Sequence, residues 1–152
     1  MSRILTSIVV AFLLLPFSNN TSAAEKNEIG LGFVLGEPTG VNTQFFWSRN
    51  TAVDLTAAWS FGDWLTLAAD YQIYNYLADL PREYKWYYGV GAYSTFPDDE
   101  DLTFGVRIPF GIKYHIPYTS MDTWVEAAPG LEVIEETEAI IHGGIGITWW
   151  LK

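Results

Sequence analysis

The sequence predicts an all-β chain whose eight strands close into a transmembrane β-barrel. Apolar and polar residues alternate with a period of two through most of the chain, as in strands with one oily and one polar face. Turn-like clusters divide this pattern into eight segments, most of them close to the roughly 9–11 residues with which a tilted strand crosses a bilayer. After residue 24, no apolar run is long enough for a transmembrane helix.

The first 24 residues form a separate segment with the features of a secretory signal peptide. Arg3 precedes an apolar run over Ile8–Phe17, and the small, polar stretch Ser18–Ala24 follows it. The apolar run is about half of the ~20 residues that a transmembrane helix needs, which argues against a permanent anchor. We expect cleavage after Ala24, with cleavage one residue earlier as the alternative, so that residues 25–152 form the barrel domain.

The predicted strands follow one another without an internal repeat or a linker. Gly, Pro, Asp and Asn gather at most of the breaks between them, and these residue types are typical of turns. In chain order, the strands are Glu28–Leu35, Val41–Trp47, Ala52–Phe61, Leu65–Tyr76, Lys85–Phe96, Leu102–Tyr114, Thr123–Val133 and Ala139–Leu151.

One parity of every strand carries no charge, whereas the other carries the charges and most of the glycines. Ile29, Leu31 and Phe33 begin the uncharged set, and Ile145 and Ile147 continue it near the end of the chain. The opposite set contains Glu28, Asp54, Asp70, Lys85, Arg107, Lys113, Glu126 and Glu132. One face of every predicted strand is therefore oily and the other polar.

Two kinds of β-protein fit this alternation, and the glycines favour a membrane barrel. In a soluble barrel the glycine-rich face would lie outside, where glycine weakens strands and adds nothing to packing. In a membrane barrel, small residues fit a narrow lumen, charges pair inside it, and aromatic residues at strand ends lie at the bilayer interfaces. Closure also satisfies every backbone polar group in lipid, which an open sheet does not.

Composition excludes several classes of function. The formal charge is −10, with 18 acidic and 8 basic residues and no basic cluster, so nucleic acid is not an expected partner. The chain has no cysteine, which excludes disulfides and thiolate metal sites.

The strand pattern carries a family resemblance. The signal peptide, the eight alternating strands and the segments YYGVGAY, FGVRIPFGIKYHIPY and IHGGIGITWWLK resemble the small eight-stranded outer-membrane barrels of the OmpA/OmpX/OmpW type. The resemblance implies an antiparallel up-and-down barrel in the outer membrane, with both termini in the periplasm. It also implies outer-membrane lipids as surroundings and the barrel assembly machinery as a partner during biogenesis. Such families commonly end in an aromatic residue, whereas this chain ends in Lys152.

With both termini in the periplasm, the connections at the outer end of the barrel form an acidic rim that contains no lysine or arginine. The rim contains Asp98, Asp99, Glu100, Asp101, Glu135, Glu136 and Glu138, and Glu37 and Asp63 belong to the same end. A solvated set of loops is the favoured interpretation, because charge runs commonly serve solubility. The alternative is a rim that binds divalent cations, which prefer oxygen ligands and would bridge to lipid phosphates.

Inside the barrel, the charged residues of the polar parity are expected to form an ion-pair network. Arg107 and Lys113 on one strand face Glu126 and Glu132 on the next, and cross-strand neighbours of this kind interact. We expect Arg107 to pair with Glu126, with Glu28, Asp54, Asp70 and Lys85 extending the network. A packed network is favoured over a charged constriction or a proton wire, because eight strands enclose little more than their own side chains.

No catalytic, cofactor or protein-bound metal site is predicted. His115 and His142 are isolated in the sequence, and neither belongs to a recognisable nucleophile or ligand pattern. Three function classes follow. A structural, envelope-integrity or surface-interaction barrel ranks first, a narrow porin-like pore for ions or small solutes second, and a lipid-A-modifying enzyme third.

Overall fold

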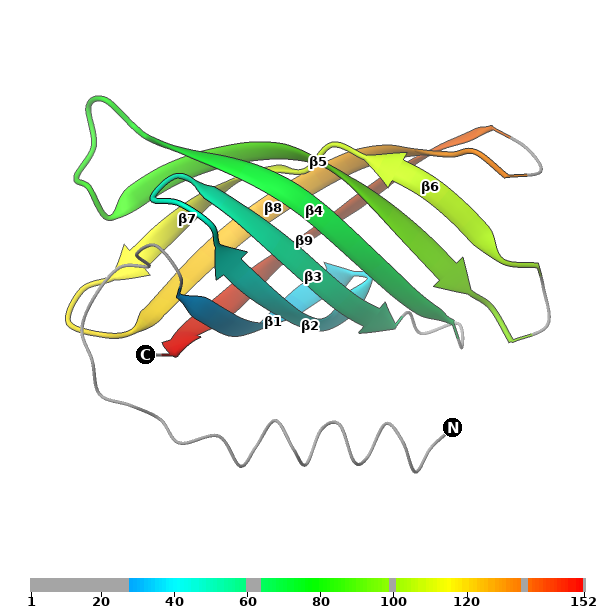
Figure 1. The fold of residues 1–152 in the computed structure, drawn as a ribbon, viewed down its shortest axis with the longest axis horizontal. Coiled ribbons are helices and arrows are strands. Elements are labelled where there is room, and N and C mark those ends of the chain that lie inside the picture. The colour runs from blue at the N-terminus through cyan, green and yellow to red at the C-terminus, as the bar shows by residue number, and fades with distance from the viewer. Residues whose placement is uncertain (1–27, 60–63, 99–100, 135–136, 152) are drawn as a thin grey trace.

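The protein is an all-β barrel with no helix in the part described by the computed structural model, namely residues 28–59, 64–98, 101–134 and 137–151 (Figure 1). Within these ranges, no helix is long and apolar enough to cross a membrane. The expected signal peptide, residues 1–24, lies outside them, as does Lys152. The strands are β1 (Ile29–Glu37), β2 (Thr39–Phe46), β3 (Thr51–Trp59), β4 (Leu65–Tyr76), β5 (Tyr84–Phe96), β6 (Thr103–Arg107), β7 (Phe110–Ile116), β8 (Met121–Glu132) and β9 (Glu138–Leu151).

Strands that follow one another in the chain pair antiparallel, except that β6 and β7 each pair with β5 and β8, and β1 pairs with β9 to close the barrel. The long strands run obliquely across the barrel in Figure 1, and the β4–β5 and β7–β8 connections lie at the same end as the start of β1 and the end of β9. We call this the terminal end, and the opposite end the mouth. The predicted eight-stranded antiparallel up-and-down barrel is confirmed, with β6 and β7 together forming one of its eight wall strands.

The sixth predicted strand, Leu102–Tyr114, is divided into β6 and β7 at Ile108 and Pro109. Proline has no N–H with which to continue a ladder. The wall nevertheless stays joined here, because Gly89 N donates to the Pro109 carbonyl at 2.8 Å and Ile108 N donates to the Pro129 carbonyl at 2.8 Å. β6 and β7 therefore act as one wall strand, paired with β5 on one side and β8 on the other.

The orientation of the side chains follows the parity predicted from the sequence. Ile108, Ile141 and Ile145 belong to the uncharged set and are 58%, 75% and 57% exposed on the outer wall. Asp54, Asp70, Arg107 and Lys113 belong to the opposite set and are buried. Most of the large apolar side chains therefore cover the outside of the barrel, and these charged side chains lie in its lumen.

We predict that Ile108→Arg or Ile147→Arg prevents stable insertion into a bilayer. Both side chains lie on the exposed apolar wall, and an arginine there costs about 2–4 kcal/mol near the bilayer midplane. The measurement is the fraction of heat-modifiable, folded protein recovered from lipid vesicles. Tyr118→Arg is the matched control, because Tyr118 is exposed in the connection between β7 and β8. Normal insertion of Ile108→Arg and Ile147→Arg would contradict the assignment of the outer wall.

Candidate functional site: the polar lumen

A buried ion pair between Asp70 and Arg107 lies in the middle of the lumen and crosses over a glycine of the strand between them. Asp70 on β4 and Arg107 on β6 both lie directly opposite Gly91 of β5, which separates their strands. Arg107 Nε donates to Asp70 Oδ1 at 2.9 Å, and Arg107 Nη2 bonds Asp70 Oδ2. Arg107 is 6% exposed and Asp70 is 2% exposed. Gly91 makes this contact possible, because a Cβ at that position would collide with the Asp70 carboxylate.

The expected pairing of Arg107 with Glu126 is wrong. On β8, Arg107 lies opposite Gly130, whereas Glu126 lies opposite Gly111, so the two residues occupy different levels of the barrel. Glu126 instead accepts a hydrogen bond from the Tyr87 hydroxyl at 2.7 Å and a long one from Gln72 Nε2 at 3.5 Å. The arginine therefore reaches across the glycine of β5 to Asp70 on β4.

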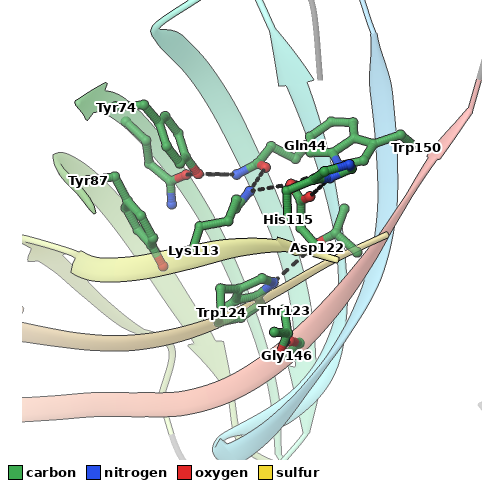
Figure 2. Close-up of polar contacts among 12 residues, drawn as sticks. Gln44, Tyr74, Tyr87, Lys113, His115, Asp122, Thr123, Trp124, Gly146 and Trp150 are labelled. Atoms are coloured by element: carbon green, nitrogen blue, oxygen red, sulfur yellow. Dashed lines mark hydrogen bonds and ion pairs between the residues drawn. The ribbon is translucent and has the colours of Figure 1, made fainter. Parts of the chain in front are cut away.

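Lys113 is buried toward the terminal end, among polar groups and aromatic rings (Figure 2). Its Nζ bonds Gln44 Oε1 and lies 4.0 Å from Asp122 Oδ2. The same Nζ is 4.9 Å from the centroid of the Tyr74 ring and 5.2 Å from that of Trp150, at distances typical of cation–π contacts. The ammonium is thus held by one carboxylate, one amide oxygen and aromatic faces.

Asp122 is a central acceptor of the terminal half, although it precedes the predicted strand Thr123–Val133. β8 begins at Met121, two residues before the predicted start, so the side chain of Asp122 points into the lumen and is buried. It accepts hydrogen bonds from Trp150 Nε1 at 2.8 Å and pairs with His115 Nδ1 at 2.7 Å (Figure 2). The signal that would have found it is the period of two, which extends from Trp124 back to Asp122.

An aromatic layer lies beside Lys113 and fills the lumen. Tyr74 and Tyr87 stack with their ring centroids 4.9 Å apart, and Phe46 contacts Tyr74 at 5.0 Å and Trp150 at 5.4 Å. All four rings are buried. The layer spans β2, β4, β5 and β9, so side chains from around the barrel meet in it.

A hydrogen-bonded chain of side chains connects the aromatic layer with the carboxylates. Asn42 Nδ2 donates to Asp54 Oδ2 at 2.7 Å, and Gln44 Nε2 lies 2.8 Å from Gln72 Oε1 and 2.7 Å from the Tyr74 hydroxyl. Buried polar groups are costly unless they are hydrogen-bonded, and this chain supplies partners for most of them. The lumen is therefore a polar core.

A small cavity remains between these groups and extends from the mouth to the aromatic layer beside Lys113. Its water-accessible volume is about 40 Å³, and Glu37, Arg107, Glu126 and His142 contribute to its lining. One water needs about 10–15 Å³ by this measure, so the cavity holds only a few water molecules. Arg107 Nη1 and His142 Nδ1 face each other across 3.5 Å within it.

The remaining predicted charges lie near the two ends. Lys85 Nζ is 5.2 Å from the centroid of the Tyr76 ring, and the carbonyl of Glu28 accepts a hydrogen bond from Phe46 N at 3.2 Å. Glu132 lies at the mouth. Of the acidic rim, Asp98, Asp101 and Glu138 are exposed, whereas Asp99, Glu100, Glu135 and Glu136 lie outside the described residues. Across the described ranges, no three His, Asp or Glu side chains are grouped to hold a metal ion.

Neither a scan against protein-family models nor a search of curated proteins finds a match. Among solved structures, the barrel is similar to the crystal structure of the N-terminal β-barrel domain of Pseudomonas aeruginosa OprF, with a TM-score of 0.66 and 11% sequence identity. The similarity covers 84% of this chain and 100% of that domain. At this identity the similarity concerns the fold, and it confirms the small outer-membrane barrel architecture that the strand pattern resembles.

We predict that Asp70 and Arg107 are energetically coupled. Arg107→Met or Asp70→Asn alone leaves a buried charge unpaired and costs about 3–5 kcal/mol, whereas the double variant loses less than the sum of the two. A double-mutant cycle of urea unfolding in lipid vesicles measures the coupling. The matched cycle pairs Arg107→Met with Glu126→Gln and should show a smaller coupling. Additive losses for Asp70 and Arg107 would show that the pair does not form.

We also predict that Gly91→Ala destabilises the barrel far more than Gly143→Ala. A methyl group at Gly91 displaces the Asp70 carboxylate, whereas at Gly143 the nearest atom is the Glu126 carbonyl oxygen at 3.2 Å. Urea midpoints of the two variants provide the comparison. Equal midpoints would mean that Asp70 and Arg107 do not need the space above Gly91.

Proposed function

We propose that this chain is an exported outer-membrane β-barrel whose filled lumen is closed to ions, and that it serves the envelope as a structural or surface-interaction protein. The apolar outer wall supports the membrane location, because a soluble protein rarely exposes so many large apolar side chains together. The similarity in fold to the OprF barrel domain supports the same location. The predicted signal peptide supplies the route of export.

The main observation in support of a lumen closed to ions is the buried aromatic layer of Phe46, Tyr74, Tyr87 and Trp150. A conducting pore needs a continuous path for water, whereas these rings pack against one another and against Lys113. The cavity that extends from the mouth to this layer holds only a few water molecules. A scaffold role is therefore favoured over the alternative of a narrow pore.

We predict that the refolded full chain produces no steady ion conductance in planar lipid bilayers. Tyr74→Ala with Tyr87→Ala removes the stacked pair and should create conductance, because two large side chains leave the lumen. Tyr118→Ala is the matched control, since it removes a tyrosine from an exposed connection. Heat-modifiable migration confirms that each variant is folded before recording. Steady conductance by the wild-type barrel would replace the scaffold proposal with the pore.

A further inference from the structure

Two glutamates face each other at the mouth of the barrel. Glu132, at the end of β8, lies directly opposite Glu138, at the start of β9. Both belong to the lumen-facing parity. Asp122 on β8 and Thr148 on β9 are buried in the lumen, and each is separated from the glutamate of its strand by an even number of positions. Directly paired residues of antiparallel strands have Cβ atoms about 4.5–5.5 Å apart, and like charges at such positions are destabilising.

No basic side chain lies at this level of the described barrel. Arg107 is the nearest base along the wall, opposite Gly130 and thus two residues deeper than Glu132 on β8. Its guanidinium is bonded to Asp70 and faces His142. The described residues Arg49, Arg82, Lys85 and Lys113 belong to the terminal half. The paired carboxylates therefore repel each other without a cation bound between them.

A buried hydroxyl without a hydrogen-bond partner lies beside the same pair. Tyr93 on β5 is 2% exposed, and its hydroxyl oxygen is buried and unpartnered. Tyr93 lies opposite Gly105 of β6, and Gly105 lies opposite Glu132, so the three residues occupy one level. The tyrosine ring covers Gly105, where a Cβ would collide with its hydroxyl end. The hydroxyl thus extends over β6 toward Glu132.

We propose that Glu132, Glu138 and Tyr93 form a site for one hydrated divalent cation of the Mg²⁺ or Ca²⁺ class at the mouth of the barrel. Both carboxylates supply the hard oxygen ligands that these ions prefer, and Mg²⁺ in particular keeps several waters while it binds one or two carboxylates. The Tyr93 hydroxyl is placed to hydrogen-bond a metal-bound water or to contribute an oxygen. The ion relieves the repulsion between the glutamates and gives the hydroxyl a partner.

The site has consequences for the mouth of the barrel. It clamps the end of β8 to the start of β9, where the ladder ends at the Glu132–Glu138 pair. A site with two carboxylates open to solvent is expected to bind weakly, in the range of about 10⁻⁴–10⁻³ M found for extracellular calcium modules. The inference rests on the strand register and on the unpartnered Tyr93 hydroxyl, and it holds whether or not the barrel conducts.

The experiment titrates CaCl₂ and MgCl₂ into the refolded full chain in detergent, at an ionic strength held constant with NaCl. Calorimetry reports the stoichiometry, and the thermal unfolding midpoint reports stabilisation. The variants are Glu132→Gln with Glu138→Gln, and Tyr93→Phe, which removes only the hydroxyl. The matched control is Asp98→Asn with Asp101→Asn, which removes the same number of rim charges from another connection.

We expect the wild type to bind one divalent ion saturably and to unfold at a higher temperature when it is bound. Glu132→Gln with Glu138→Gln should abolish saturable binding, and in EDTA it should unfold at a temperature at least as high as that of the wild type, since the repulsion is gone. Tyr93→Phe should weaken binding about tenfold, as the loss of an outer-shell partner does. Asp98→Asn with Asp101→Asn should bind as the wild type does.

Any of three results would overturn the site. The first is a wild type without saturable binding, and the second is a Glu132/Glu138 double variant that binds as the wild type does. The third is an equal loss of binding in the Asp98/Asp101 variant, which would show diffuse attraction to the whole acidic rim. If the Glu132/Glu138 variant does not refold, Glu138→Gln alone provides the test, because Glu138 is exposed at the first position of β9.

Discussion

The narrowness of an eight-stranded barrel is the constraint on which the rest of this structure depends. Eight strands enclose little more space than their own inward side chains occupy. Many of the large side chains in the lumen therefore lie beside a glycine of a neighbouring strand. Gly91 lies between Asp70 and Arg107, and Gly105 lies beneath the ring of Tyr93. At these glycines of the polar face, the missing side chain leaves space that a large side chain of a neighbouring strand occupies.

The same constraint explains why the buried charged groups of the lumen have partners and why side chains fill the lumen. A guanidinium taken out of water is costly unless it has a partner, and Arg107 finds one in Asp70. Lys113 meets Asp122 and Gln44, and aromatic rings complete its surroundings. The interior thus combines ion pairs with an aromatic layer. Such an interior holds the strands of the barrel together from within and leaves little space for solvent.

The two ends of the barrel differ in chemistry because of where the bases lie. The described lysines and arginines belong to the terminal half, apart from Arg107, which is bonded within the lumen. Asp98, Asp101 and Glu138 are exposed at the mouth, and Glu132 lies opposite Glu138. The mouth is therefore the end at which an external cation meets the strongest uncompensated negative charge among the described residues. The terminal end neutralises its buried acids internally, as Asp122 shows.

The sequence by itself determined roughly where the wall strands lie and the face to which their side chains point, because successive side chains of a strand alternate between two faces. Ile108 on the wall and Asp70 in the lumen follow from this period alone. Tertiary structure decided which side chains meet. Arg107 and Asp70 are 37 residues apart on strands that are not adjacent, and they pair because the register places both beside Gly91. Asp122 joined the lumen because β8 starts at Met121. Parity is a property of one strand, whereas a partner across the lumen depends on the register of every strand between the two and on the curvature that closes the barrel.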